Sequence, residues 1–447
     1  MASRLIVIGG VAAGMSAAAK ARRTDRDLEI IAYEKGSFIS YAACGMPYWL
    51  AGDIPDHEKL IVRSPEQMRK QGIQVQVRHE VTAIEADTRT VTVKDLENEN
   101  TFTQGYDRLV LGTGARPAWP PLGSTGLPGV FGLRSLESGL ALQQFIRENS
   151  PQKAVIVGGG YIAIEMAETF RRLGLDATMM VRSGKILRST LDDDMRELVE
   201  AELARYGVRV ITGTLTSLEG DDQVVAAASA HERVPCDLVL MGMGARPNVE
   251  LAKAAGATLG PTGAIATDAY MRTNLPDVYA AGDCCEVLNL VTGKPAYIPL
   301  GSTANKQGRV AGENAAGGQA RFGSVVGTMV VRCFNLVVAS TGLTAARASA
   351  AGFKVQETMV RAKDISHYFP GASDIHVKLV VDGSRDRLLG GQIVGSRGVA
   401  KRIDVLATAL YNRMSITELR QLDLSYAPPF APVWDPILVA ANVAAKE

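Results

Sequence analysis

The chain has 447 residues, 47% of them hydrophobic and 21% charged, which is typical of folded proteins with two to four domains. Its 48 basic and 47 acidic residues give a net charge of +1, which argues against nucleic acid or a membrane as the main partner. No apolar run approaches the roughly 18 residues of a membrane helix, and the N-terminus lacks a secretory signal pattern. We therefore expect a cytoplasmic protein whose five cysteines are reduced unless catalytic.

Residues 4–34 follow the order strand, glycine-rich turn, helix, strand. Gly9 makes the turn, and Gly14 lets the helix pack closely on the strand, so that the helix N-terminus meets a pyrophosphate. Glu34 ends the second strand 20 residues after Gly14, where an acid binds a ribose hydroxyl. Val11 replaces the middle glycine of this fingerprint. The alternative is a glycine-rich turn of another kind of α/β protein.

Cys44 stands ten residues after Glu34 and three before Pro47. Proline is accepted in the first turn of a helix, so we expect a helix to begin here, with Cys44 at or just before its first turn. Backbone amides and the helix dipole would then favour the thiolate and give a nucleophile of low pKa. The alternative is a small buried cysteine beside a turn.

A second fingerprint follows the apolar strand at residues 154–157, with Gly158 and Gly160 in the turn. Two fingerprints imply two dinucleotides, one a flavin and the other a nicotinamide. The second unit ends in Val181 without an acid, and Arg182 and Lys185 follow. A positive charge there suits a 2′-phosphate, which favours NADPH over NADH. The alternative is a solvated basic loop.

Two similar segments, residues 111–117 and 241–247, each follow an apolar strand and end in Gly-Ala-Arg-Pro. We expect them to mark where the chain crosses between the two nucleotide domains. A further apolar strand ends at Gly282 and Asp283, where a carboxylate can reach the ribityl chain of a flavin. A turn residue or a helix cap is the alternative for Asp283.

From about residue 324 the nucleotide motifs cease, and the pattern predicts an α+β domain. Residues 328–338, 375–381 and 388–394 are predicted strands, and residues 425–436 form an aromatic and proline-rich segment suited to an interface or a ligand lid. A predicted helix carries one apolar face, made of Ile403, Leu406, Ala407, Leu410 and Tyr411.

With these motifs in this order, the chain resembles the pyridine-nucleotide disulfide oxidoreductases, and most of all their single-cysteine branch, the coenzyme A-disulfide reductases. Trp49 stands where two-cysteine members carry their second cysteine, and neither His367 nor His376 matches their catalytic base. Ala12 stands where the related peroxidases and NADH oxidases place a histidine. The resemblance implies an α/β fold with two Rossmann-like domains, for FAD and NAD(P), and a C-terminal α+β dimerisation domain.

The resemblance divides the chain at three positions. It implies a first part of the FAD-binding domain at residues 1–118 and an NAD(P)-binding domain at 119–247. The second part of the FAD-binding domain is expected at 248–323, and the dimerisation domain at 324–447.

The activity implied by the resemblance is the NAD(P)H-dependent reduction of coenzyme A disulfide through FAD and a Cys44–S–S–CoA mixed disulfide. Tyr368 and Tyr426 match the family's proton donors. The resemblance implies that they come from the partner subunit of a homodimer, so that each active site needs both chains.

The resemblance also implies cofactor and substrate positions. No cluster of cysteines, histidines and carboxylates in the sequence has metal-ligand spacing, so we expect no metal site. For coenzyme A the matching positions are Ser16, Lys20, Arg23, Ser40, Asn305 and Trp434, whereas Ala43 replaces an asparagine often found in the family. The expected cofactor positions are Gly9, Gly14, Glu34, Lys35, Val81, Thr113, Gly114, Arg134, Gly158, Gly160, Tyr161, Ile162, Arg182, Lys185, Gly244, Asp283 and Ala304. For the basic residues of the first helix, a solvated last turn is the alternative.

Other functions stay open. A coenzyme A-dependent persulfide or polysulfide reductase is one alternative, although no sulfurtransferase module precedes the last residue, Glu447. An NADH oxidase is another, and a flavin-bearing redox sensor with Cys44 as its regulatory thiol belongs to a different class. A second redox pair at Cys284 and Cys285 is a minor possibility because vicinal cysteines form a strained bridge, and Cys236 and Cys333 are expected in the core.

Overall fold

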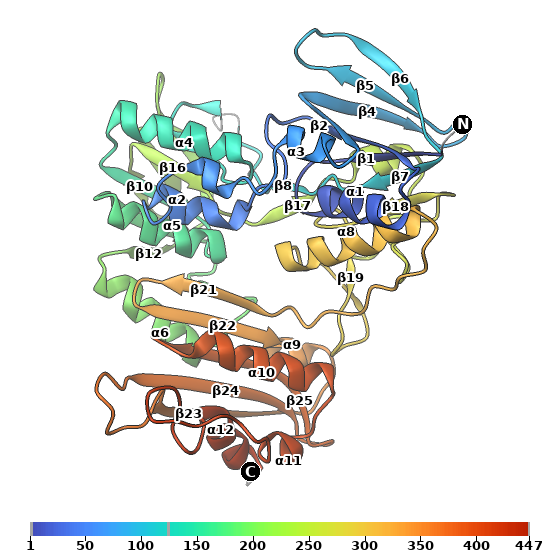
Figure 1. Ribbon diagram of the computed structural model, residues 1–447. Coiled ribbons are helices and arrows are strands. Elements are labelled where there is room, and N and C mark those ends of the chain that lie inside the picture. Colours follow the sequence, from blue (N-terminus) through green and yellow to red (C-terminus); the bar gives the residue numbers. More distant parts are fainter. Residues whose placement is uncertain (1–2, 123–125, 446–447) are drawn as a thin grey trace.

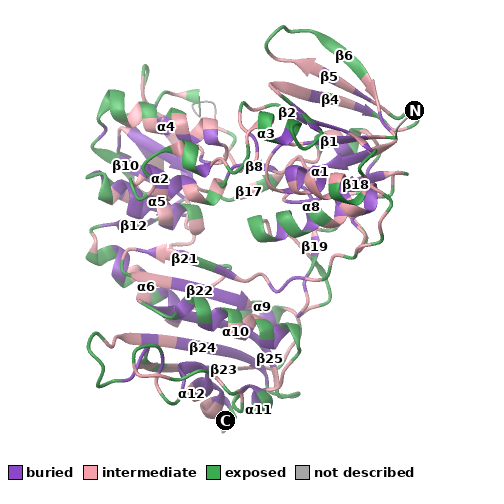
Figure 2. Cartoon of the chain, in the orientation of Figure 1, coloured by how far each residue is buried: buried purple, intermediate pink, exposed green. Residues whose placement is uncertain are grey.

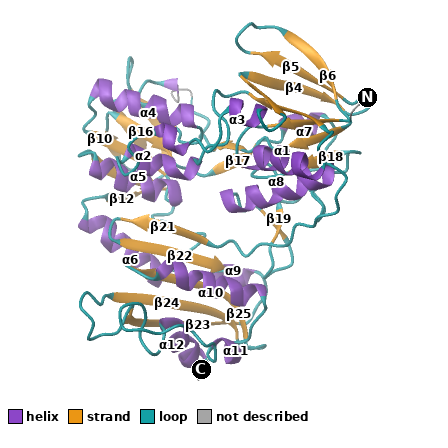
Figure 3. Cartoon of the chain, viewed as in Figure 1, coloured by secondary structure: helices purple, strands orange, loops and turns teal. Residues whose placement is uncertain are grey.

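The computed structural model describes residues 3–122 and 126–445. Figure 1 shows three parts, with two α/β units side by side at the top and a layered unit carrying the C-terminus below them. Figure 3 shows that helices cover the strands of all three parts. Among the described residues, no helix has the length and apolar character needed to cross a membrane.

The first unit is built on a parallel five-stranded sheet in the order β18-β7-β1-β2-β3. Its central strand is buried on both faces, as its continuous apolar sequence predicts, and Leu5, Ile6 and Val7 are fully buried. Helices α1 (Ala12–Thr24) and α8 (Gly301–Ala315) pack against each other beside this sheet. The strands are β1 (Arg4–Ile8), β2 (Glu29–Glu34), β3 (Ile73–Val77), β7 (Arg108–Leu111) and β18 (Val278–Ala280).

Smaller elements complete the first unit. An antiparallel sheet is formed by β4 (His79–Glu85), β5 (Thr90–Asp95) and β6 (Thr101–Gly105). Short helices lie at α3 (Pro65–Arg69) and α7 (Glu250–Ala254), with 3₁₀ turns at η1 (Ala43–Gly45) and η2 (His57–Leu60). The short helix α2 (Met46–Leu50), although it comes from the first part of the chain, packs on α4 (Leu136–Asn149) and α5 (Tyr161–Arg172) of the second unit. A two-stranded ribbon pairs β19 (Val287–Leu288) with β20 (Pro295–Ala296).

The second unit repeats the parallel arrangement in the order β12-β11-β10-β16-β9. Its strands are β9 (Val130–Phe131), β10 (Lys153–Val157), β11 (Asp176–Val181), β12 (Arg209–Thr212) and β16 (Leu238–Met241). The helices are α4 (Leu136–Asn149), α5 (Tyr161–Arg172) and α6 (Asp193–Arg205). A side sheet contains β13 (Leu215–Glu219), β14 (Ala226–Ser229) and β15 (Arg233–Pro235).

The two Gly-Ala-Arg-Pro segments pair with each other, as expected for a crossing. Strand β8 (Ala115–Pro117) runs antiparallel to β17 (Ala245–Pro247), with Arg116 opposite Arg246. In Figure 1 this ribbon lies between the two upper units. The chain therefore leaves the first unit and returns to it through one paired connection.

The third unit is an antiparallel sheet in the order β21-β22-β25-β24-β23. Helix α10 (Val399–Tyr411) packs on β22 and β25, and α12 (Pro436–Ala444) packs on β23 and β24. Figure 2 shows its sheet as one of the most buried parts of the chain. The strands are β21 (Met329–Cys333), β22 (Leu336–Gly342), β23 (Val355–Lys363), β24 (Asp374–Asp382) and β25 (Arg387–Gly395), with short helices α9 (Ala345–Ala350) and α11 (Ile416–Leu419).

The single strand predicted at residues 328–338 is wrong. Two strands, β21 and β22, share this stretch and pair as a hairpin through Cys333 and Leu336. Phe334 adopts the left-handed conformation with φ 52°, which turns the chain. The predicted helix is confirmed at α10, although Tyr411 at its end is half exposed.

Candidate active site

Cys44 lies in the 3₁₀ turn η1, directly before the one-turn helix α2 with Pro47 in its first turn. The predicted helix start is confirmed. Cys44 is exposed, whereas Cys236, Cys284, Cys285 and Cys333 are buried. Of the five cysteines, Cys44 alone can therefore meet a substrate without a rearrangement of the core.

The prediction of a low pKa for Cys44 is wrong. The atoms packed around its sulfur desolvate the thiolate and raise the pKa of Cys44, and the carboxylates of Glu165 and Asp283 raise it further. The Arg134 guanidinium lowers the pKa, but less than these effects raise it. Helix α2 has only five residues, so its dipole does not outweigh two nearby carboxylates.

Glu165 is a half-buried acid that sequence reasoning did not find. It lies on α5, and the Tyr48 hydroxyl of α2 donates a 2.9 Å hydrogen bond to its carboxylate. Burial raises the pKa of Glu165 to about 7, and the charge of Glu168 adds to the increase, while the Tyr48 hydrogen bond and Arg332 oppose it. The available sequence signal was its place in the first turns of the helix that follows the second fingerprint.

Arg332 joins the three units next to this acid. It reaches from β21 to Glu168 of α5 at 2.7 Å and to Asp53, just after α2, at 2.6 Å. Its guanidinium carbon also lies 5.0 Å from the centroid of the Tyr48 ring. Arg172 of α5 forms a 2.5 Å ion pair with the same Asp53. These contacts fix the helix that follows Cys44 against α5 and the third unit.

The first glycine loop has the close approaches that the fingerprint requires. Gly9 has φ +107°, and a Cβ there would lie 2.2 Å from the oxygen of Gly112. A Cβ on Gly14 would lie 1.8 Å from the oxygen of Gly9. The carboxylate of Glu34 accepts hydrogen bonds from the Gly10 amide at 2.6 Å and the Gly36 amide at 2.7 Å. The acid therefore lies at the loop, as predicted.

Val11, which replaces the middle glycine, has φ −104°, a value open to any L-residue. No side chain caps α1, and its first turn holds no acidic residue. The amides of this turn can therefore donate to an anion such as a pyrophosphate.

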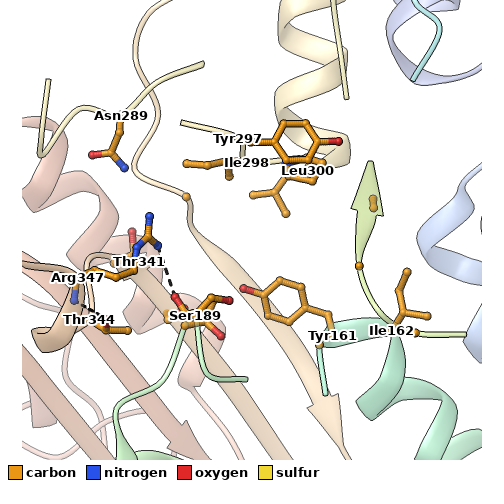
Figure 4. A pocket seen from close by; sticks show the side chains of 18 of the residues that line it. Tyr161, Ile162, Ser189, Asn289, Tyr297, Ile298, Leu300, Thr341, Thr344 and Arg347 are labelled. Carbon is orange, nitrogen blue, oxygen red and sulfur yellow. Dashed lines mark hydrogen bonds between the residues drawn. The ribbon is translucent and has the colours of Figure 1, made fainter. Parts of the chain in front are cut away.

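The second loop borders a cavity of about 380 Å³ between the units. Figure 4 shows Tyr161, Leu300 and Arg347 reaching this space from three separate parts of the chain. Arg347 of α9 donates a 3.5 Å hydrogen bond to the oxygen of Ser189, and sequence reasoning missed it. Of the predicted cofactor positions, those that line the cavity are Arg134, Gly160, Tyr161, Ile162 and Gly244.

The basic residues after β11 differ in their contacts. Lys185 forms a 2.6 Å ion pair with Asp193, which lowers the pKa of that carboxyl to about 2. Arg182 is exposed and has no hydrogen bond or ion pair with any described residue. Of the two, Arg182 is the side chain with a free charge.

The predicted substrate positions on α1 face α8. The Ser16 hydroxyl donates a 2.7 Å hydrogen bond to Asn305, and Lys20 forms a 2.8 Å ion pair with Glu313. Arg23 is exposed. Of the three predicted positions on α1, Ser16 and Lys20 are therefore the two that bond to α8. Ser40 has a left-handed backbone with φ 46°, and its amide donates to the oxygen of Gly10 in the glycine loop.

Tyr368 and Tyr426 belong to loops of the third unit and are 63% and 46% exposed. The two loops are joined by a 3.3 Å hydrogen bond from the Ser366 amide to the oxygen of Pro428. Trp434, a predicted substrate position, is 60% exposed on the same chain segment as Tyr426. Further exposed apolar side chains on these loops are Phe369, Phe430 and Val433.

Two family models cover most of the chain. Residues 3–308 match the pyridine nucleotide-disulphide oxidoreductase model, and residues 329–436 match the model of that family's dimerisation domain. The chain belongs to the pyridine nucleotide-disulphide oxidoreductase family. It is therefore an FAD-dependent NAD(P)H oxidoreductase, and its dimerisation domain supports a homodimer.

Individual relatives of this oxidoreductase differ in their substrates. It is 37% identical over 444 residues to the NAD(P)H coenzyme A polysulfide/persulfide reductase of Pyrococcus horikoshii, covering 99% of this chain and 98% of that protein. It is 31% identical over 433 residues to the coenzyme A disulfide reductase of Staphylococcus haemolyticus, covering 96% of each. Its structure matches a NAD-dependent persulfide reductase from A. fulgidus at a TM-score of 0.96 and 39% identity, covering 99% of this chain and 83% of that one.

The residues around the end of β18 fit the FAD of this oxidoreductase. The side chain of Gln307 is 1% exposed, and its oxygen accepts a 2.9 Å hydrogen bond from the Gly282 amide. No described residue accepts from its Nε2, so this buried donor is free for a ligand. Asp283 forms an ion pair with Arg134, and Ala304 lies against Gly282. Several predicted FAD positions thus meet at one place.

The remaining predicted positions have structural contacts of their own. The Thr113 hydroxyl donates a 2.8 Å hydrogen bond to the oxygen of Asn248 across the crossing, and Gly114 has φ +65°. Val81 is buried in the core beside β1 and β2, whereas Lys35 is exposed after β2. In the second loop, Gly158 has φ +129°, and a Cβ there would lie 2.1 Å from the oxygen of Gly242.

Proposed function

We propose that this oxidoreductase reduces the sulfur–sulfur bond of a coenzyme A-linked substrate and that Cys44 is its nucleophile. The observation that carries the proposal is the exposure of one cysteine beside a helix start, where Trp49 excludes a second cysteine. Trp49 belongs to α2, and its side chain is buried in the core with 3% exposed. A single accessible sulfur supports exchange through a mixed disulfide rather than through an internal disulfide.

The proposed reaction is a thiol–disulfide exchange at Cys44, followed by reduction of the mixed disulfide. The Cys44 thiolate forms a bond to one sulfur of the substrate, and the substrate S–S bond breaks, with its electron pair leaving on the second sulfur as a thiolate. That thiolate takes one proton. FAD, when bound, would supply two electrons from NAD(P)H. Cleavage of the mixed disulfide with these electrons would return Cys44 as a thiolate and release the other half as a second thiolate. The second released thiolate takes another proton and leaves as a thiol.

Tyr368 and Tyr426 are the proposed proton donors. A proton placed on the leaving thiolate prevents its return to the mixed disulfide. Both hydroxyls are exposed on the dimerisation domain, which suits residues that complete a site of the partner subunit. Trp434, exposed on the same segment, is the proposed apolar contact to the substrate.

The coenzyme A nucleotide is proposed to lie along the face shared by α1 and α8. Ser16 and Asn305 already share a hydrogen bond there, and either can turn to a ligand. Lys20 and Arg23 supply positive charge for its phosphates as charge-assisted hydrogen bonds. Ser40 is the proposed contact nearest to Cys44 in the chain.

Two substrates compete within this class. Coenzyme A disulfide follows from the single-cysteine pattern of the sequence. Coenzyme A persulfide is the second candidate because relatives named as persulfide reductases share 37–39% identity with this chain, against 31% for the coenzyme A disulfide reductase. Both substrates place a sulfur–sulfur bond at Cys44.

Steady-state oxidation of NADPH and NADH tests the proposal with coenzyme A disulfide, coenzyme A persulfide and O₂ as separate acceptors. We expect turnover with one of the two coenzyme A substrates that is lost in Cys44→Ser. Equal turnover with O₂ alone, retained in Cys44→Ser, would favour an oxidase instead. Absence of turnover with every acceptor would favour a redox sensor.

A further inference from the structure

The acid that is hydrogen-bonded to the cysteine helix has no part in the chemistry above. Glu165 comes from the NAD(P) unit, yet its carboxylate accepts a hydrogen bond from Tyr48, four residues after Cys44. The Thr169 hydroxyl, one turn along α5, donates a 3.1 Å hydrogen bond to the oxygen of Pro47. Two contacts therefore attach the cysteine helix to this face of α5.

The charged groups around Glu165 come from every element packed against it. Glu168 and Arg172 lie on α5, Asp53 follows α2, and Arg332 lies on β21. Arg332 is bound by Glu168 and Asp53, so its positive charge is largely satisfied before it acts on Glu165. A Glu165 carboxylate is therefore held by one neutral phenol, not by a cation of its own.

The charged groups that act on Cys44 are Glu165, Arg134 and Asp283. Arg134 and Asp283 form an ion pair with each other, so that their opposite charges largely cancel. The charge on Glu165 is then the unbalanced one near the sulfur. Two negative charges close together in a partly desolvated place repel, and each disfavours the ionisation of the other.

We propose that Glu165 is a positioning residue that sets the charge of Cys44, with a protonated carboxyl group permitting the thiolate and an ionised one opposing it. Burial raises the pKa of Glu165, and the hydrogen bond from Tyr48 lowers it because this bond stabilises the ionised carboxylate. This inference rests on the proposed function, in which the Cys44 thiolate is the nucleophile.

The sign of the effect follows from the two charges. At a pH where Glu165 is protonated, replacing it by glutamine changes no charge, and Cys44 keeps its reactivity. At a pH where Glu165 is ionised, the same substitution removes a negative charge beside the sulfur, and the pKa of Cys44 falls. The gain in thiolate therefore exists only above the pH at which Glu165 loses its proton.

The test starts from holoenzyme that has been reduced and desalted. Iodoacetamide alkylates Cys44 at a series of pH values between 5.5 and 8.5, and peptide mass spectrometry measures the rate. For Glu165→Gln we expect a rate close to that of the wild type at pH 5.5 and about three- to tenfold higher at pH 8, as for removal of one like charge. In Tyr48→Phe the carboxylate of Glu165 loses its hydrogen-bond donor and ionises at a higher pH. We therefore expect the inhibition of Cys44 to begin at a higher pH in this variant.

The matched control is Glu197→Gln, because Glu197 is an exposed acid on α6 without an ion pair to any described residue. It should match the wild type at every pH. A Glu165→Gln rate that differs from the wild type by a constant factor at all pH values would overturn the inference, since a structural change has no reason to follow this titration. A Cys44 that resists alkylation at every pH would overturn the proposed nucleophile and this inference with it.

Discussion

The hydroxyls of Tyr368 and Tyr426 lie 3.5 Å apart, although 58 residues separate them in the chain. The hydrogen bond between them lowers the pKa of Tyr368, because it stabilises a phenolate there, and raises the pKa of Tyr426. The two phenols therefore share one hydrogen bond and differ in acidity. Two exposed loops of the dimerisation domain hold the pair in place.

Removal of either hydroxyl should slow protonation of the leaving thiolate. We expect Tyr426→Phe and Tyr368→Phe each to lower kcat with the coenzyme A substrate by about 100-fold, a usual value for a lost general acid. Reduction of the flavin by NAD(P)H, followed by stopped-flow absorbance, should be unchanged. Tyr411→Phe is the control, because this half-exposed tyrosine of α10 donates its hydrogen bond to the oxygen of Ser324, away from the two loops that carry Tyr368 and Tyr426. Normal turnover in both variants would remove the tyrosines from the mechanism.

Arg182 should set the preference for NADPH. Since it carries a free charge after β11, we expect Arg182→Ala to raise the KM for NADPH about tenfold or more, the usual effect of losing a hydrogen bond to a charged group. The KM for NADH should change little. Lys185→Ala should have a smaller effect because Lys185 already pairs with Asp193. Equal KM changes for both nucleotides would contradict this role.

The buried ion pair in the third unit should be important for stability. Arg402 and Asp435 are 1% and 3% exposed and lie 2.9 Å apart, and Asp435 also accepts a hydrogen bond from Ile437 at the start of α12. Asp435→Asn leaves a buried arginine without its counter-ion and should cost about 3–5 kcal/mol in the free energy of unfolding.

Urea unfolding measures this cost, and the matched control is Asp374→Asn. Asp374 pairs with Arg361 on the surface, where an ion pair contributes only about 0–1 kcal/mol. A similar loss for the two variants would show that burial of the pair does not matter.

Glu165 should also make stability depend on pH. Burial raises its pKa from 4.5 to about 7, so between these values the folded chain holds a proton that the unfolded chain releases. The folded state therefore loses stability as the pH rises through this window, by about 3 kcal/mol when complete. Urea unfolding should show that the stability of Glu165→Gln increases relative to that of the wild type as the pH rises from 4.5 to 7. A constant difference over that range would contradict the raised pKa.

Much of the fold could be predicted from local patterns. The two fingerprints with their apolar strands indicated both parallel sheets, and the repeated Gly-Ala-Arg-Pro segments indicated the paired crossing of β8 and β17. The hairpin of β21 and β22 could not be predicted in this way. Its turn depends on a left-handed Phe334, a conformation that few residues other than glycine adopt.

The candidate site could be predicted less completely. Local sequence placed Cys44 before a helix, but its pKa depends on Glu165, which is distant in the chain and acts on Cys44 only when α5 packs on α2. The pairing of Arg134 with Asp283 and the role of Arg332 likewise arise from contacts between units. The residue types in the sequence indicated the chemistry of the site, whereas the pKa values and ion pairs of its charged groups depend on tertiary contacts.

The central claim is that Cys44 forms a mixed disulfide with coenzyme A. Its most direct test is peptide mass spectrometry of the oxidised enzyme after treatment with one equivalent of coenzyme A disulfide, without reductant. We expect one coenzyme A moiety per chain on the peptide that contains Cys44, released by dithiothreitol and absent in Cys44→Ser. An unmodified Cys44, or an adduct on Cys284 or Cys285 instead, would contradict it.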